Sequence, residues 1–212
     1  MNVILEKRND ISVDNGQVDS ISAKLGINRK IAELLFLRGI KTEEEARAFL
    51  FPDVYNFYDP FLMKGMRGAV ERINQAIENG EKIVVYGDYD ADGVCSNAIL
   101  SLYLKSRGMQ VYSHTPNRIG DGYGLNNDTL EKIIEEIMPD LIITCDCGIS
   151  CSEEVELVKD LGVDIIITDH HEPGVSIPDC IVVNPKQSDC EYPFKGLCGA
   201  GVVLKLVQAL SG

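Results

Sequence analysis

The sequence predicts an α/β protein: a mostly parallel β-sheet with helices on both faces, preceded by a small helical N-terminal segment. Beyond residue 80, short uninterrupted runs of Val and Ile alternate with helix-like segments of about ten residues. Strands that are apolar at every position are buried on both faces, as in a parallel sheet between two layers of helices. We therefore expect a helical leader over residues 1–62 and the α/β domain over residues 63–212.

The leader contains two short helices with recognisable ends. The first covers Arg29–Arg38, where apolar residues recur at helical spacing, and it stops at Gly39. Thr42 and Glu45 form a capping-box pattern that opens a second helix over Glu43–Leu50. These signals predict a small helical unit ahead of the α/β domain.

A connector rich in aromatic side chains follows the second helix. Prolines at positions 52 and 60 break helical structure there. We expect the rings to pack onto the domain that follows, because basic residues are not interleaved with most of them. Stacking on nucleobases is the alternative. The aromatic residues are Phe51, Tyr55, Phe57, Tyr58 and Phe61.

Alternating helices and strands account for the rest of the chain. Strands are expected at residues 82–86, 110–114, 141–144, 165–168 and 181–183. Helices are expected at residues 69–79, 94–107, 128–138, 153–161 and 202–210. A glycine at positions 80, 108 and 162 follows three of these helices, and glycine is the residue with which helices commonly end.

Composition and charge limit the possible functions. With 212 residues, 45% of them hydrophobic, the chain can bury a sizeable core. No apolar run approaches the roughly 20 residues of a membrane helix, and the N-terminus lacks a signal-peptide pattern, so we expect a cytoplasmic protein without membrane association. The net charge of −13 has the wrong sign for binding nucleic acid by bulk electrostatics. Bound divalent cations, or a basic domain outside this chain, would remove that conflict.

The seven cysteines are an odd number, which suits reduced thiols in a cytoplasmic protein. A zinc site built from Cys145, Cys147 and Cys151 is the rival interpretation. It lacks a paired C-x-x-C motif, and alternate residues of one strand point to opposite faces. We therefore do not expect a thiolate metal site.

Acidic and imidazole side chains gather directly after three of the expected strands. Ligands of parallel sheets bind beyond the carboxyl ends of the strands, so these side chains can converge on one crevice. Crowded carboxylates stay ionised most readily around a cation, and oxygen and imidazole ligands suit Mn²⁺ or Mg²⁺. The residues are Asp88, Asp90 and Asp92 after the first strand, Asp146 after the third, and Asp169, His170 and His171 after the fourth.

Two of these carboxylates also have simpler explanations. Asp92 stands before Gly93 and a helix, and could serve only as a helix N-cap. Asp88 could serve mainly to orient its neighbours through hydrogen bonds.

Two further segments could bind phosphate. Arg118 lies in a loop after the second strand, where its guanidinium either binds a phosphate through paired hydrogen bonds or is an exposed loop charge. Gly196, Gly199 and Gly201 lead into the last helix, and a structural turn or an anion site at the helix N-terminus would each explain them. No G-x-G-x-x-G follows the first strand and no P-loop motif occurs, so nicotinamide dinucleotide and P-loop nucleotide binding lose their main support.

Three ordered motifs resemble the DHH phosphoesterase superfamily, and within it the branch of single-stranded-DNA exonucleases. They are the segments Tyr86–Gly93, Thr144–Ile149 and Thr168–His171, and the resemblance extends from about residue 25 to the end of the chain. It implies that two Mn²⁺ or Mg²⁺ ions bind to Asp90, Asp92, Asp146 and His170, with Asp146 bridging the ions. It also implies that His171 contacts or orients the scissile phosphate and that Arg118 binds a phosphate of the DNA. We expect Asp88 to support the catalytic site.

The resemblance implies two-metal-ion hydrolysis that removes mononucleotides from single-stranded DNA in the 5′ to 3′ direction, during DNA repair and recombination. Single-stranded-DNA-binding proteins or helicases are the implied partners. The alternatives are a phosphoesterase acting on short oligonucleotides, nucleotides or pyrophosphate, and a noncatalytic replication module. A fourth family motif with another metal-binding Asp would lie beyond Gly212, as would further lobes. We therefore expect an N-terminal fragment with an incomplete metal shell, weak or inactive without its C-terminal lobes.

Overall fold

The structure, a computed structural model, describes residues 12–53, 57–116 and 124–212. The chain divides into two compact units, Met1–Phe57 and Tyr58–Gly212. The division falls inside the aromatic connector that links the helical leader to the α/β domain.

The described part of the first unit packs short helices around a small apolar core. They are α1 (Asn15–Leu25), α2 (Arg29–Leu37) and α3 (Glu43–Leu50). The capping box of α3 is confirmed, because the Thr42 hydroxyl accepts a hydrogen bond from the N–H of Glu45 and the Glu45 carboxylate accepts one from the N–H of Thr42. The core residues are Val18, Ile21, Ala32, Leu35, Phe36 and Ala46.

The connector aromatics were expected to pack onto the domain that follows. Tyr58 does so, because its ring lies edge-on to that of the buried Tyr192 with the centroids 5.9 Å apart, but none of the described connector rings is itself buried. Pro60 and Met63 take the buried positions instead, so the short turn after the connector is anchored by a proline and a methionine. Tyr55 lies outside the described residues. The described rings, each at least 40% exposed, are Phe51, Phe57, Tyr58 and Phe61.

The second unit alternates helices and strands close to the expected positions. Its helices are the 3-10 turn η2 (Pro60–Leu62), α4 (Met66–Asn79), α5 (Ala91–Ser106), α6 (Asn127–Ile137), α7 (Ser152–Asp160) and α8 (Gly199–Ser211). Its strands are β1 (Ile83–Gly87), β2 (Val111–His114), β3 (Leu141–Cys145), β4 (Asp164–Thr168) and β5 (Ile181–Val183).

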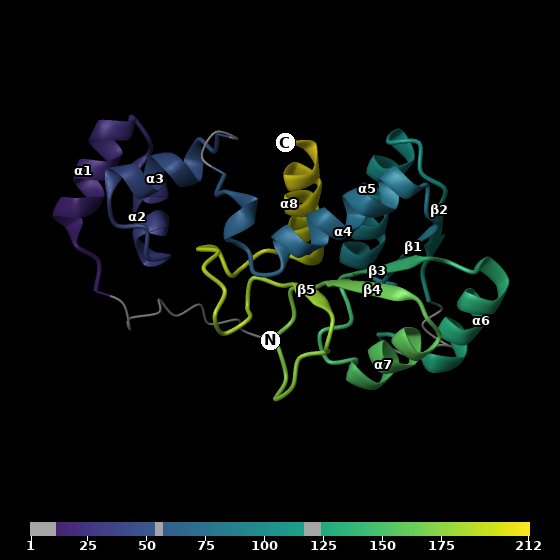
Figure 1. Ribbon diagram of the computed structural model, residues 1–212. Coiled ribbons are helices and arrows are strands. Elements are labelled where there is room, and N and C mark those ends of the chain that lie inside the picture. Colours follow the sequence, from purple (N-terminus) through teal and green to yellow (C-terminus); the bar gives the residue numbers. More distant parts are fainter. Residues whose placement is uncertain (1–11, 54–56, 117–123) are drawn as a thin grey trace, which may run out of the picture. The chain divides into compact units, whose positions relative to one another are not determined.

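The described strands form one parallel sheet in the order β2-β1-β3-β4-β5. Helices α4, α5 and α8 cover one face of the sheet, and α6 and α7 cover the other (Figure 1). Alternate residues of a strand enter opposite cores, so Val85 packs under α5 while Val84 packs under α6. The predicted fold class is confirmed. No helix in the described ranges combines the length and the apolar composition of a membrane span.

The register of the sheet aligns the ends of β1, β3, β4 and β5. Their last residues lie at one level and are Gly87, Cys145, Thr168 and Val183. The hydrogen-bond ladder continues one residue further, because the next N–H groups after β1, β3 and β4 donate to the neighbouring strand at 2.9–3.2 Å. A row of polar residues therefore crosses the carboxyl edge of the sheet. This polar row consists of Asp88, Asp146, Asp169 and Asn184.

The winding of the sheet reverses at β1. The chain adds β2 on one side of β1 and then β3, β4 and β5 on the other side. In open parallel sheets the ligand crevice lies at this reversal, beyond the carboxyl ends of the two strands that flank it. Those strands are β1 and β3, and the residues that follow them are Asp88 and Asp146.

Gly65 and Gly80 provide a test of how α4 is attached to the sheet. Both have positive φ, but a Cβ on Gly65 would lie 2.0 Å from the carbonyl oxygen of Val182, whereas a Cβ on Gly80 would meet nothing within 4 Å. We expect Gly65→Ala to lower the free energy of unfolding by about 3 kcal/mol or more, and Gly80→Ala by only about 1 kcal/mol. Denaturant unfolding measures both values, and equal losses would contradict the close contact between α4 and β5.

Candidate metal centre

Asp146 lies at the middle of the carboxyl edge and is enclosed by the polypeptide. It is only 2% exposed, and its backbone has a φ of +66°, a left-handed conformation that Asp adopts more readily than most residues. Gly199, the first residue of α8, packs directly against it. A Cβ on Gly199 would lie 2.6 Å from both Cβ and Oδ1 of Asp146. The carboxylate is therefore confined between the sheet edge and the start of α8.

Asp90 and Asp92 bind the N-termini of two different helices. Oδ1 of Asp90 accepts hydrogen bonds from the N–H groups of Asp92 and Gly93, at 2.8 and 3.0 Å, which makes Asp90 the N-cap of α5. The carboxylate of Asp92 accepts hydrogen bonds from Gly199 and Ala200, at 2.7 and 2.8 Å, at the start of α8. The glycine-rich segment before α8 therefore binds an anion, and that anion is a carboxylate of the same chain. The simpler explanation of Asp92 as an N-cap is wrong, because Asp90 caps α5.

Five of the expected residues come together in two overlapping groups. The potential ligand atoms of Asp146, His170 and His171 all lie within 4.8 Å of one another. The same is true of Asp88, Asp90 and Asp146. Asp146 belongs to both groups, which is the arrangement needed for one carboxylate to serve two neighbouring cations.

His170 connects Asp92 to this centre. Its Nε2 atom lies 3.1 Å from Oδ1 of Asp146 and 3.6 Å from Oδ2 of Asp92. The imidazole does not donate a hydrogen bond to the Asp146 oxygen in spite of this distance. A cation lying against all three side chains would have two carboxylate oxygens and one imidazole nitrogen as ligands.

Two buried carboxylate oxygens at this centre accept no hydrogen bond from the residues that the structure describes. They are Oδ1 of Asp88 and Oδ1 of Asp146. A buried charge without a partner is costly, and the several carboxylates here also repel one another. A hard divalent cation relieves both costs, and Mn²⁺ and Mg²⁺ accept carboxylate oxygen ligands. The residues present therefore fit such an ion.

The carboxylates differ in how readily they ionise. Burial, together with the negative charges of Asp92 and Asp90, raises the pKa of Asp146 to about 7. Burial also raises the pKa of Asp88, and the charge of Asp90 adds to this effect. Burial also tends to raise the pKa of Asp92. The hydrogen bonds from the Ala200 and Gly199 amides of α8 lower it, and the net result is a lowered pKa. Asp146 is thus the carboxylate that gains most from a bound cation.

Asp169 orients the two histidines, a role that was not among the expectations from the sequence. It is 1% exposed, and its Oδ1 accepts hydrogen bonds from the N–H groups of His170 and His171, at 2.7 and 3.1 Å. The same oxygen lies 2.7 Å from Nδ1 of His171, and Oδ2 accepts a hydrogen bond from the N–H of Ile149 at 3.0 Å. Because a carboxylate accepts this bond, Nδ1 of His171 carries the proton and Nε2 is the unprotonated ring nitrogen. The available signal was the position of Asp169 directly before the histidine pair.

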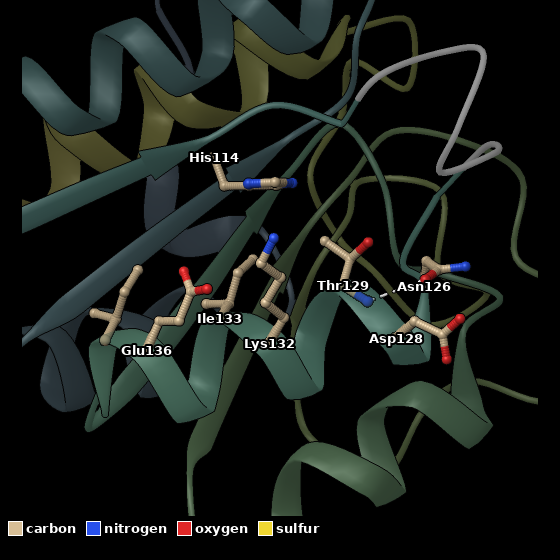
Figure 2. Close-up of a pocket in the computed structure, with 8 residues that line it drawn as sticks. His114, Asn126, Asp128, Thr129, Lys132, Ile133 and Glu136 are labelled. Carbon is tan, nitrogen blue, oxygen red and sulfur yellow. Dashed lines mark hydrogen bonds between the residues drawn. The ribbon is translucent and has the colours of Figure 1, made fainter.

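A cavity of the described structure lies apart from this centre. It has a volume of about 510 Å³ and lies between the end of β2 and α6, where Lys132 points toward His114 (Figure 2). None of the candidate metal-centre residues lines it. Arg118, the expected phosphate-binding residue, lies outside the described residues. The lining residues are His114, Asn126, Asp128, Thr129, Lys132, Ile133, Glu136 and Ile137.

The chain is similar to a family model and to several known proteins. The model described as the DHH family, N-terminal domain, matches residues 82–212. The single-stranded-DNA-specific exonuclease RecJ of Bacillus subtilis is 48% identical over 200 residues, which are 94% of this chain and 25% of that protein. This chain thus spans about a quarter of the length of that relative.

Two crystal structures of RecJ from Thermus thermophilus are also similar to this chain. The structure in complex with Mn²⁺ has a TM-score of 0.73 at 31% identity, and the match covers 93% of this chain and 27% of that one. The structure in complex with Mg²⁺ has a TM-score of 0.60 at 27% identity, with 93% and 23% covered.

Gly199 and Gly201 test the contact between α8 and Asp146. We expect Gly199→Ala to weaken Mn²⁺ binding at least about tenfold and to cost about 1–3 kcal/mol of stability, because the added methyl group overlaps Asp146. Gly201→Ala is the matched control in the same helix, since its methyl group would meet the Leu197 side chain and not Asp146, and the nearest atom, Cδ2 of Leu197, lies 3.1 Å away. It should keep Mn²⁺ affinity and leave stability unchanged or raise it by up to about 1 kcal/mol. Calorimetric titration and denaturant unfolding give both values, and similar behaviour of the two variants would refute the contact.

The raised pKa of Asp146 predicts how metal binding and stability depend on pH. Between its ordinary pKa of 3.8 and the folded value of about 7, the folded chain holds a proton that the unfolded chain has lost. Stability of the metal-free chain should therefore fall as the pH rises through this range. Mn²⁺ should bind about tenfold more weakly at pH 6 than at pH 8 and should release a proton at the lower pH. Calorimetry in buffers of different ionisation enthalpy measures this release; binding without it at pH 6 would show that Asp146 is already ionised.

Proposed function

The chain belongs to the DHH family, and from this premise we propose that it carries the N-terminal catalytic core of a single-stranded-DNA exonuclease that depends on divalent metal ions. The observation that carries the proposal is that Asp146 belongs to both groups of potential metal ligands. The proposed reaction is hydrolysis of phosphodiester bonds from the 5′ end of the strand, in DNA repair and recombination. A cytoplasmic location, and helicases or single-stranded-DNA-binding proteins as partners, belong to the same proposal.

The relatives support the substrate class and the metal. RecJ of Bacillus subtilis is named a single-stranded-DNA-specific exonuclease, and it is 48% identical over 94% of this chain. RecJ of Thermus thermophilus has been crystallised in complex with Mn²⁺ and in complex with Mg²⁺. The proposal gives this chain the same substrate class and the same choice of ions.

The proposed metal ligands are those that the family resemblance implies, and the distances at the centre are compatible with them. His170 and Asp92 approach Asp146 from one side, with Nε2 of His170 at 3.1 Å from Asp146 and 3.6 Å from Asp92. Asp88 and Asp90 form the second group with Asp146, in which the potential ligand atoms lie within 4.8 Å of one another. In the proposal, Asp90, Asp92, Asp146 and His170 are ligands, and Asp146 bridges two ions. Asp88 supports them, since its buried Oδ1 accepts no hydrogen bond within the described part of the chain.

The chemistry follows from these roles. Two divalent ions, when bound, would supply an activated water and would stabilise both the attacking and leaving oxygens of an in-line displacement. Asp169 holds Nδ1 of His171 at 2.7 Å, so Nε2 is the ring atom that can contact the scissile phosphate. Arg118 is proposed to bind a further phosphate of the strand through its guanidinium. The α8 amides fix Asp92 before substrate arrives, so less reorganisation is required during the reaction.

The acidic composition is compatible with a DNA substrate under this proposal. The formal net charge is −13, and three of the negative charges are Asp90, Asp92 and Asp146 at the centre itself. Bound divalent cations reverse the local sign of the field that a phosphate meets there. The relatives also have about three quarters of their length outside the matched region, which gives room for a basic DNA-binding surface.

A chimera tests the proposal: this chain replaces the matched region of Bacillus subtilis RecJ. We expect the chimera to digest 5′-phosphorylated single-stranded DNA in the presence of Mn²⁺, and the chain alone to cleave far more weakly. Asp146→Asn keeps the shape of the side chain and removes its charge, so it should reduce the rate about a thousandfold, which corresponds to several kcal/mol of transition-state stabilisation. Asp128→Asn in the separate cavity is the control and should leave the rate nearly unchanged.

The same assay separates the other possible functions. Dinucleotides and pyrophosphate are offered alongside the long single strand. Faster turnover of either small substrate would favour a phosphoesterase of nucleotides or pyrophosphate. A folded chimera that neither cleaves DNA nor binds Mn²⁺ would favour a noncatalytic module and would end the exonuclease proposal.

A further inference from the structure

The fourth member of the polar row, Asn184, is an uncharged residue directly beside Asp169. Its side chain is completely buried. Its Nδ2 donates a hydrogen bond of 2.9 Å to the carbonyl oxygen of His171, and its Oδ1 accepts one of 2.8 Å from the N–H of Lys186. We propose that Asn184 is a positioning residue that holds His171, and with it His170, in the orientation that the metal centre needs. The inference rests on the proposed function and adds to it a residue outside the three motifs.

The orientation of the Asn184 amide follows from its two partners. A backbone N–H can only donate, so the atom facing Lys186 must be the oxygen. A backbone carbonyl can only accept, so the atom facing His171 must be the nitrogen. Both partners therefore require the same orientation. Only an amide of this length supplies an acceptor and a donor at these two points, so an aspartate of the same shape cannot replace it.

Asn184 and Asp169 hold His171 at two different points. Asp169 binds the Nδ1 atom of the ring and the backbone N–H, and Asn184 binds the carbonyl oxygen at the other end of the same residue. The rings of His170 and His171 lie together, with their centroids 4.5 Å apart. A shift of the His171 backbone would therefore also move His170 relative to Asp146. Residues that orient metal ligands in this way commonly affect metal affinity tenfold to a hundredfold.

The turn that contains Asn184 does not need this hydrogen bond for its own structure. Gln187 ties the turn to β5, because its Nε2 donates to the carbonyl oxygens of Val182 and Asn184, at 3.0 and 3.2 Å. The Asn184 acceptor is used within the turn, by the N–H of Lys186. Of the two side-chain hydrogen bonds that Asn184 forms with described residues, the one to His171 connects it to a residue outside its own turn. We therefore attribute to this hydrogen bond the positioning of His171 and not the stability of the turn.

Asn184→Asp and Gln187→Glu form a matched pair that tests the inference. Each change converts a buried amide into a carboxylate of the same shape in the same turn, and Gln187 is only 4% exposed. Only Asn184→Asp places an oxygen against the His171 carbonyl. Asn184→Ala removes the same hydrogen bond without adding a charge, so at least one folded variant is available. Denaturant unfolding of each variant shows the general loss of stability.

Two measurements on the whole chain report the position of the histidines. The first is NMR of the ring nitrogens in the metal-free chain, which has only three histidines, so that each can be assigned by substitution. The second is Mn²⁺ titration by calorimetry. We expect both Asn184 variants to shift or broaden the His171 ring signals and to weaken Mn²⁺ binding about tenfold to a hundredfold. Gln187→Glu should leave the ring signals in place and change affinity less than about threefold, even where it loses comparable stability.

The possible outcomes separate this inference from the proposed function. Unmoved His171 signals and full Mn²⁺ affinity in a folded Asn184 variant would overturn the positioning role. Equal effects of Gln187→Glu would overturn it too, because the loss would then come from the turn as a whole. An unaltered chain that binds no Mn²⁺ would count against the proposed function, while the NMR signals would still decide whether Asn184 holds His171.

Discussion

The parallel register of β1, β3, β4 and β5 is the constraint on which the rest of the structure depends. It brings the ends of four strands to one level, and the ladder of backbone hydrogen bonds continues one residue beyond them. Residues that are 96 positions apart in the sequence (88 to 184) thereby become neighbours in the polar row. A shift of one strand by a single residue would remove that strand's polar side chain from the row; for β3, Cys145 or Cys147 would take the place of Asp146. The apolar cores on both faces of the sheet prevent such a shift, because each strand residue is specific to one face.

The protein stabilises the negative charge at this edge in two ways. Asp90 and Asp92 each face the N-terminus of a helix, where unpaired amides favour an anion. Asp169 is satisfied by three backbone amides and an imidazole nitrogen. Asp146 lacks comparable donors, and the raised pKa of its carboxyl group is the consequence. The same geometry therefore stabilises Asp90, Asp92 and Asp169 within the protein and leaves Asp146, and to a lesser extent Asp88, dependent on a proton or a cation.

The sequence predicted the sheet and most of the centre because both depend on short-range patterns. Uninterrupted Val and Ile runs identify buried strands, and the residue after each strand follows directly from its end. Contacts between segments far apart in the sequence could not be predicted from such patterns. The α8 amides that bind Asp92 lie 107 positions away from it, and Asn184 looks like an ordinary turn residue until the register is known. The aromatic connector has the same limitation. Its aromatic side chains suggested burial, but whether a ring is buried depends on neighbouring segments that the sequence does not identify. Arg118 stays a prediction, because the structure does not describe it.

The central claim, that the carboxyl edge of the sheet is a divalent-metal centre built around Asp146, is tested most directly by anomalous diffraction from crystals grown with Mn²⁺. The account requires a manganese peak within about 2.2 Å of a carboxylate oxygen of Asp146. The same ion should also be bound by His170, Asp92 or Asp90. Well-ordered crystals in which manganese is absent from Asp146, or lies only at exposed acidic residues elsewhere, would contradict the account.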